Sequence, residues 1–203
     1  MRAGVARRLR RFAARASAGR RPCYEAIVLQ IGGRGRQAKD LVDALLDCHG
    51  RIRQMMEIAR ALVAAAPGAP AGEVREAAAR VRRYFVEALP RHVEDEEASI
   101  APRLRGRDPA VDAALAEMTA EHTRHDALVA RLVALCRRLE AEPERLPEVQ
   151  GELGEVTGAL DAELAAHLAR EEEVVFPAIR RLLDEGERAA IHAELRARRT
   201  SDR

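Results

Sequence analysis

Aromatic residues are the scarcest part of this sequence: its 203 residues include three Phe, two Tyr and no Trp. The aromatic and β-branched runs that typify strands are therefore missing, and the abundant Ala, Leu, Arg and Glu favour helices instead. The sequence also lacks any apolar stretch close to the roughly 20 residues that a membrane-spanning helix needs. These absences argue against a sheet fold and against a transmembrane segment, and we expect an all-α protein.

Cysteine is also rare, with only Cys23, Cys48 and Cys136 in the chain and no CxxC pair. An odd number of scattered cysteines argues against a disulfide framework and fits a reducing compartment, so we expect a cytoplasmic location. Cys48 directly precedes a histidine. We expect it to be a small buried helix residue rather than a redox group.

The formal net charge of +2 hides an uneven distribution of arginine. Residues 1–21 contain eight arginines and no acid, whereas the rest of the chain has 27 basic and 33 acidic residues. Such a segment can contact nucleic acid or an anionic membrane surface. Because it has no interleaved aromatic pattern, no recognition helix and no apolar signal-peptide core, we expect residues 1–35 to be a disordered Arg-rich extension and predict no nucleic-acid partner.

Proline and glycine divide the remaining sequence into four long helical segments and one short one. The predicted helices cover residues 36–66, 73–104, 111–141, 149–184 and 187–198. Four helices of about 30 residues joined by short loops favour an antiparallel up-down-up-down four-helix bundle with a short C-terminal helix. We expect the bundle over residues 36–185 and the short helix and tail over residues 186–203. Pro90, Pro102 and Pro177 are expected to kink or fray the second and fourth helices locally.

One motif occurs twice, 75 residues apart, once in each half of the predicted bundle. His92 and His167 are followed four residues later by Glu96 and Glu171, and ten residues later by a proline. Because residues four apart share a helix face, each copy can direct an imidazole and a carboxylate to one point. A first-row transition metal accepts both of these ligand types.

Five of the six histidines fall on the apolar faces of the predicted helices: His49, His92, His122, His125 and His167. A single histidine in such a place is more often a hydrogen-bonded core residue, and a single i,i+4 His–Glu pair is usually a surface pair. Here that explanation would have to hold on four helices at once, with two carboxylates buried without compensation. A bound cation removes this cost, so the pattern predicts a metal site.

The internal repeat narrows the set of predicted ligands. Aligning CHGRIRQMM of the first helix with EHTRHDALV of the third pairs one histidine with another and places His125 opposite Ile52, an ordinary core residue. The predicted ligands are His49, His92, Glu96, His122, His167 and Glu171. These six suffice for two metals if the glutamates bridge, and they leave open positions for a small exogenous ligand. His125, one turn from His122, is either an extra ligand or a residue that hydrogen-bonds a ligand.

Other polar residues near the motifs are expected to lie beside the predicted ligands rather than to bind the metal as strongly as these do. Glu97 and Glu172 lie about 100° around the helix from the predicted bridging glutamates, so we expect them at the surface or hydrogen-bonded to ligands. Asp126, four residues after His122, is a weaker carboxylate candidate. Tyr84, eight residues before His92, is a candidate hydrogen-bond donor beside the site.

Four stretches of the chain resemble the hemerythrin-like family, also called the HHE cation-binding domain. They are LLDCHGRIRQMM, RYFVEALPRHVEDEEASIAPRL, MTAEHTRHDAL and HLAREEEVVFPAIRRLL, within about residues 38–184. The resemblance implies a four-helix bundle with a non-heme di-iron site bridged by carboxylates and held by the same six residues. Oxygen-carrying hemerythrins have HxxxH on the third helix, whereas Asp126 stands four residues after His122 here. A third helix of this kind is similar to that of the repair-of-iron-centres proteins.

We therefore expect two non-heme iron ions, Fe2+ or Fe3+, with manganese and zinc as metals that the same ligands accept. The expected function is to bind or sense O2, NO or peroxide, or to buffer iron. The alternatives are a di-iron oxidoreductase or an iron donor for iron–sulfur cluster repair at the same site, and a metal-free helical interaction module. The sequence identifies no redox partner and no oligomeric state. Because ligands bind metal without their protons, metal should be lost below the usual histidine pKa of about 6.5.

Overall fold

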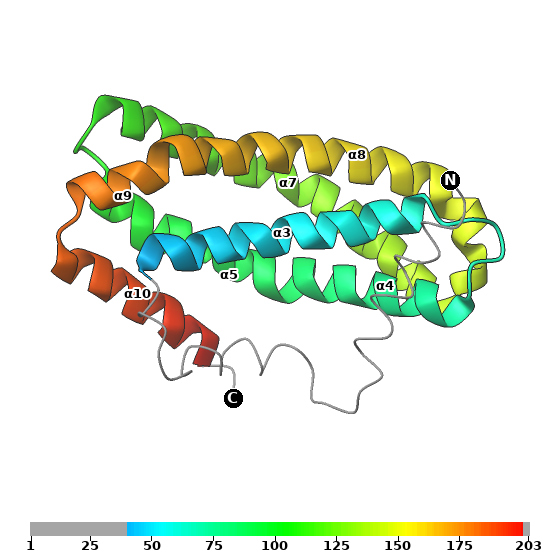
Figure 1. Ribbon diagram of the computed structural model, residues 1–203. Helices are drawn as coiled ribbons and strands as arrows, with labels where there is room; N and C mark the ends of the chain where they lie inside the picture. The colour runs from blue at the N-terminus through cyan, green and yellow to red at the C-terminus, as the bar shows by residue number, and fades with distance from the viewer. Residues whose placement is uncertain (1–39, 201–203) are drawn as a thin grey trace.

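The computed structural model describes residues 40–200, and this part of the chain is helical without any strand (Figure 1). The predicted extension over residues 1–35 lies outside the described residues. In chain order the elements are α3 (Leu41–Val63), α4 (Ala71–Arg83), η2 (Tyr84–Ala88), α5 (Leu89–Glu94), η3 (Asp95–Ile100), α6 (Ala101–Leu104), α7 (Pro109–Ala141), η4 (Pro143–Arg145), α8 (Leu146–Arg170), η5 (Glu171–Val175), α9 (Phe176–Leu182) and α10 (Glu185–Thr200). Of the η elements, η4 is a 3-10 turn and the others are π-helical turns.

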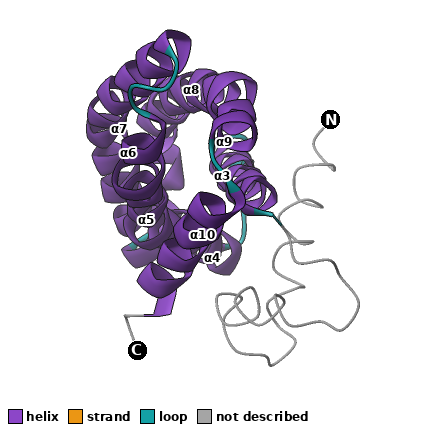
Figure 2. Cartoon of the chain, turned by 90° about the vertical axis from the view of Figure 1, so that its left-hand side faces the viewer, coloured by secondary structure: helices purple, strands orange, loops and turns teal. Residues whose placement is uncertain are grey.

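These elements join into four long arms that run alternately up and down (Figure 1). The first arm is α3, the second runs without a break from α4 to α6, the third is α7, and the fourth runs from α8 to α9. The first and third arms each pack against both the second and the fourth. The expected all-α bundle is therefore confirmed, and α10 lies outside the four arms against α3 and η3 (Figure 2).

Aspartate caps and glycine turns mark the ends of the arms. The side chain of Asp40 accepts a hydrogen bond from the backbone N–H of Asp43 at 2.7 Å, and α3 begins after it. Asp108 caps α7 in the same way, with Pro109 at the first helical position, where its missing N–H costs nothing. Gly68 and Gly106 adopt positive φ angles of 82° and 78° in the loops after the first and second arms. These local signals place the turns where the sequence predicts them.

The apolar core consists of two clusters with a polar layer between them. The cluster nearer the loop that joins α3 to α4 includes Ile52, Phe85, Leu132 and Leu160. The cluster nearer α10 includes Leu45, Ile100, Leu115 and Ile179. Each arm passes from one cluster to the other through a buried histidine, so the polar side chains meet at one level of the bundle.

Each of the three prolines inside the second and fourth arms follows a π turn. Pro90, Pro102 and Pro177 come two residues after η2, η3 and η5 end. The residue before each proline donates its N–H to the carbonyl five residues earlier, from Leu89 to Tyr84 in the first case. Proline has no N–H and its ring collides with the carbonyl four residues back, and a widened turn relieves both problems. The expected kinks are thus realised as π turns within continuous arms, without fraying.

A search of the described helices for one long and apolar enough to cross a membrane gave none.

Candidate metal centre

The polar layer brings together all six residues that the sequence predicts as ligands. The side chains form two groups. Within each group, every side chain has a nitrogen or oxygen atom that lies within 4.8 Å of those of the other members. The first group is His49, His92, Glu96 and Glu171, and the second is Glu96, His122 and His167. All six residues are buried. Glu96 belongs to both groups, so the two groups adjoin each other.

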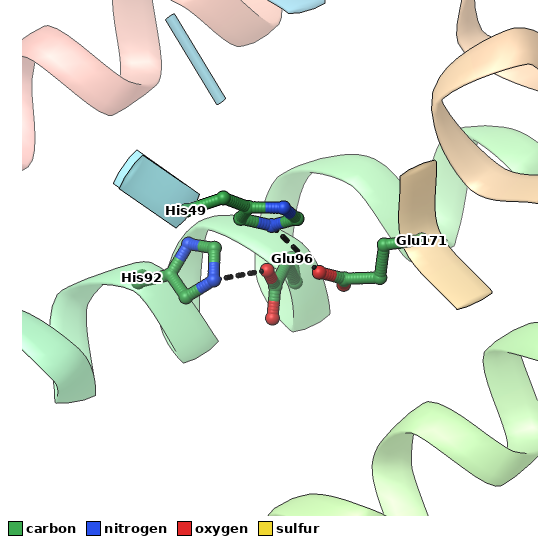
Figure 3. Close-up of side chains that lie close together, drawn as sticks. All are labelled: His49, His92, Glu96 and Glu171. Atoms are coloured by element: carbon green, nitrogen blue, oxygen red, sulfur yellow. Dashed lines mark ion pairs between the residues drawn. The ribbon is translucent and has the colours of Figure 1, made fainter. Parts of the chain in front are cut away.

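Each of the two glutamates is shared by one histidine from each half of the bundle. Glu96 lies 2.8 Å from Nε2 of His92 and 3.1 Å from Nε2 of His122. Glu171 lies 2.9 Å from Nε2 of His49 and 3.7 Å from Nε2 of His167. Figure 3 shows His49 and His92 facing these two carboxylates. The glutamates therefore occupy bridging positions between the halves.

The π turns fix the backbone at both glutamates. The carbonyl of Glu96 accepts the N–H of Ala101, and the carbonyl of Glu171 accepts the N–H of Phe176. In both cases the donor is the residue before a proline, so the proline of each motif determines the turn that carries its carboxylate. The repeated spacing of histidine, glutamate and proline thus determines two things: a pair of predicted ligands on one helix face, and the π turn that positions the glutamate.

Many atoms of the site lack a hydrogen-bond partner among the described residues. They include Nε2 of His49, His92 and His122, and both carboxylate oxygens of Glu96 and of Glu171. Their mutual distances are short, but the N–H directions do not form hydrogen bonds of good geometry. Buried polar atoms left in this state are costly. Nitrogen and oxygen lone pairs that converge in this way fit a cation, which would satisfy all of them.

Two further glutamates hold the outer nitrogens of two histidines. Nδ1 of His49 lies 2.7 Å from Glu172, and Nδ1 of His122 lies 2.8 Å from Glu97. Both carboxylates are partly exposed, at 28% and 43%. As expected, these two residues lie toward the surface and contact histidines that are predicted as ligands. Such contacts fix the tautomer and the orientation of the ring, which leaves Nε2 free to face a metal.

Glu121 contacts the outer nitrogen of a third histidine in the same way, a role that the sequence pattern did not predict. Its carboxylate is only 4% exposed, lies 3.0 Å from Nδ1 of His167, and accepts a hydrogen bond from Arg170. Burial alone would raise the pKa of Glu121, but these hydrogen bonds outweigh it and lower the pKa. The burial of Glu121 could have been predicted from its spacing, because it lies three residues after Met118 and four before His125, on the apolar face of α7.

His125 lies beside the site but in neither group of clustered atoms. Its ring packs against the rings of His167 and His122, with centroids 5.3 Å and 6.5 Å apart. Its Nε2 atom has no hydrogen-bond partner among residues 40–200 and lies 3.9 Å from the carboxylate of Glu163. Burial and the neighbouring His167 lower the pKa of His125 to about 4, so the ring is neutral at ordinary pH. The position favours a neighbour of the ligands over an additional ligand.

The structure corrects three expectations about the surroundings of the site. Tyr84 is no partner of His92, because Nδ1 of that histidine has no hydrogen bond within the described residues. The ring of Tyr84 meets that of Phe85 edge to face, with centroids 5.7 Å apart. Cys48 is partly exposed rather than buried. Asp126 is exposed and does not join the site.

Without a metal, the pKa values of the site residues are shifted in different directions. Burial would lower the pKa of His92, but Glu96 outweighs it and raises that pKa to about 10. Burial and the charge of Glu96 raise the pKa of Glu171 to about 8. Burial and the neighbouring His92 lower the pKa of His49 to about 4. At neutral pH, His92 and Glu171 therefore carry protons that a metal must displace.

Metal uptake at neutral pH should release protons from His92 and Glu171. Both pKa values are raised, to about 10 and about 8, so the competing protons are bound below these values and lost above them. Affinity should therefore increase as pH rises from neutrality toward 10 and should decrease in acid. Calorimetric titrations in two buffers of different ionisation enthalpy count the protons released. Uptake without proton release at neutral pH would contradict this assignment.

Replacing Glu121 by Gln should weaken the metal position that contains His167. The neutral amide cannot fix the imidazole as strongly, and loss of such a partner typically costs about 10- to 100-fold in metal affinity. Glu117→Gln is the matched control, since Glu117 lies one turn earlier on α7 and pairs with exposed Arg124 rather than with a histidine of the site. Competition with a chelator measures both affinities. Equal affinities in the two variants would show that Glu121 has no such role.

Comparison with models of protein families gives a match to the hemerythrin HHE cation binding domain over residues 40–150 and again over residues 130–199. Searches of curated proteins and of solved structures returned no match. The matched ranges contain all four arms, α10 and both groups of clustered ligand atoms. Fold, motif and family model agree, and the chain belongs to the hemerythrin HHE cation-binding family.

Proposed function

We propose that this chain is a non-heme di-iron protein that binds or senses a small ligand, O2, NO or peroxide, at its metal pair. The observation that carries the proposal is the position of Glu96 and Glu171, each shared by a histidine of either half. His49 and His92 would hold one metal, and His122 and His167 the other. The two carboxylates would bridge them.

The donor set supports iron as the resident metal. Four imidazoles and two carboxylates form a mixed nitrogen and oxygen site of the kind that iron accepts, and no cysteine belongs to either cluster. Two shared carboxylates and two histidines for each metal leave coordination positions unfilled. An iron pair with such positions would bind a small ligand and exchange electrons with it. Zinc and manganese accept the same donors and are tested as competitors.

The residues of the chain supply the surroundings of the metals. The carboxylates of Glu97, Glu121 and Glu172 hold the outer nitrogens of three histidines, which keeps their Nε2 atoms directed inward. The apolar clusters above and below the polar layer exclude water from it. The ring of Phe176 packs on His49 with centroids 4.8 Å apart and closes one side of the site. A site of this kind favours a small uncharged ligand over a bulky substrate.

The location that we propose is the cytoplasm. Cys48 and Cys136 are free thiols in the part of the chain that the structure describes, as expected in a reducing compartment.

Anaerobic iron loading should give two metal ions per chain, measured by elemental analysis after gel filtration. The combined substitution of His92 and His167 by Ala removes one histidine from each position, and it should lower the count to one or none. Iron should also stabilise the fold, by about 2.7 kcal/mol when free metal is roughly 100 times its Kd. A rise in Tm measures this effect. A metal-free interaction module would show neither the count nor the rise.

His192→Ala is the control for the count, because His192 lies on α10 and outside both clusters of ligand atoms. Its iron content should equal that of the unmodified chain. Optical spectra of the ferrous protein after O2, NO or peroxide then separate binding from catalysis. A stable stoichiometric adduct supports a binding or sensing role, whereas continuous consumption of NO or peroxide would replace it with the oxidoreductase alternative.

A further inference from the structure

The two halves of the site treat equivalent histidines differently. His92 and His167 hold the same place in the repeated motif. Nδ1 of His167 lies 3.0 Å from the carboxylate of Glu121. Nδ1 of His92 is buried and has no hydrogen-bond partner within the described residues. Figure 3 shows Nε2 of His92 turned toward Glu96, with the other ring nitrogen turned away from it.

Cys48 occupies the position in the first half that Glu121 occupies in the second. Each directly precedes the first histidine of its half, Cys48 before His49 and Glu121 before His122. Burial lowers the pKa of His92, and Cys48 is among the groups that raise it. A thiol is a weak hydrogen-bond acceptor and is shorter than a glutamate. His92 therefore lacks, among the described residues, the carboxylate partner that its counterpart His167 has.

Guanidinium groups surround both positions. Glu121 accepts a hydrogen bond from Arg170 and lies 3.7 Å from Arg124. Arg51 holds the place of Arg124 in the repeat, and its Nη2 atom lies 3.5 Å from Sγ of Cys48.

The second guanidinium beside Cys48 comes from α10. Asp95, the residue equivalent to Arg170, is fully buried and binds Arg199 at 2.5 Å. Burial would lower the pKa of Arg199, but Asp95 and Cys48 outweigh it and raise that pKa. Arg51 and Arg199 thus interact with Cys48, as Arg124 and Arg170 interact with Glu121. The environment fits an oxygen anion or another strong oxygen acceptor, yet a thiol occupies it.

We propose that Cys48 is a site of reversible oxidation by peroxide, and that the oxygen gained by its sulfur becomes the hydrogen-bond acceptor for Nδ1 of His92. The thiol and hydrogen peroxide give a sulfenic acid and water. A sulfur–oxygen bond forms, the peroxide O–O bond breaks, and the thiol proton leaves with the departing oxygen as water. Sulfur loses two electrons and peroxide gains them. A thiol reductant reverses the step.

Exposure distinguishes Cys48 from the other described cysteine. Cys48 is partly exposed, so peroxide can reach it, whereas Cys136 is fully buried in the apolar cluster. The consequence for metal binding rests on the proposed function. An oxygen acceptor on Nδ1 fixes an imidazole and strengthens it as a ligand, so oxidation of Cys48 should tighten the metal position that contains His92. The chain would then hold metal more firmly after exposure to peroxide.

The first experiment uses the full chain with Cys23→Ser, free of metal, treated with hydrogen peroxide and then with a dimedone-type trap for sulfenic acids. Peptide mass spectrometry should find the trapped adduct at Cys48 and not at Cys136. Arg51→Met combined with Arg199→Met should reduce the adduct. Arg198→Met is the matched control, since Arg198 also binds Asp95, at 2.8 Å. Absence of the adduct at Cys48, or no effect of the Arg51 and Arg199 substitutions, would overturn the proposal.

The second experiment measures release of zinc, which is inert to peroxide, from the loaded chain to a chelator. Peroxide should slow release from the position of His92 by about tenfold, a thiol reductant should restore it, and Cys48→Ala should abolish the response. Cys48→Glu restores the carboxylate of the other half, and it should show slow release without peroxide. Equal release from oxidised wild-type and oxidised Cys48→Ala chains would refute the link to His92.

A third measurement separates this proposal from the proposed metal function. In the metal-free chain, the 15N signal of Nδ1 in His92 should shift on peroxide treatment and return with the reductant, and Cys48→Ala should show no shift. A chain that binds no metal but shows this shift would contradict the di-iron function alone. A chain that binds two metals without the shift would contradict the role of Cys48 alone.

Discussion

The burial of two carboxylates at the centre of the bundle is the constraint on which the rest of the structure depends. Glu96 and Glu171 are each 1% exposed, and both their oxygens lack hydrogen bonds among the described residues. An uncompensated charge in such a place is strongly destabilising. One histidine from each arm approaches these carboxylates, so the compensation involves all four arms at one level. The two apolar clusters on either side hold this level fixed.

The prolines show how a local sequence feature sets the geometry of the centre. A regular α-helix cannot accept proline in its interior without losing a hydrogen bond. The chain responds with a π turn whose hydrogen bond ends on the carbonyl of Glu96 in one half and of Glu171 in the other. The turn therefore lies at the ligand itself. The prolines and the predicted metal ligands thus belong to one repeated motif.

Spacing along single helices predicted the fold and the convergence of the six clustered residues, because a 3.6-residue period determines which side chains share a face. Contacts between arms were harder to predict. Glu121 reaches His167 across two arms, and nothing in the i,i+4 pattern of α7 specifies that pairing. Tyr84 was expected to hydrogen-bond His92 and does not, because eight residues span about 12 Å along a helix, farther than a shared face alone can bridge. Cys48 was expected to be buried, but it is partly exposed and lies beside Arg51, which helical periodicity alone does not encode.

Crystallography of the iron-loaded chain with anomalous scattering at the iron edge tests the central claim most directly. The claim predicts two anomalous peaks, one between His49 and His92 and one between His122 and His167, with Glu96 and Glu171 in contact with both. A single peak, or metal bound at His125 and Glu163 instead, would contradict a carboxylate-bridged pair of metals at the centre of this bundle.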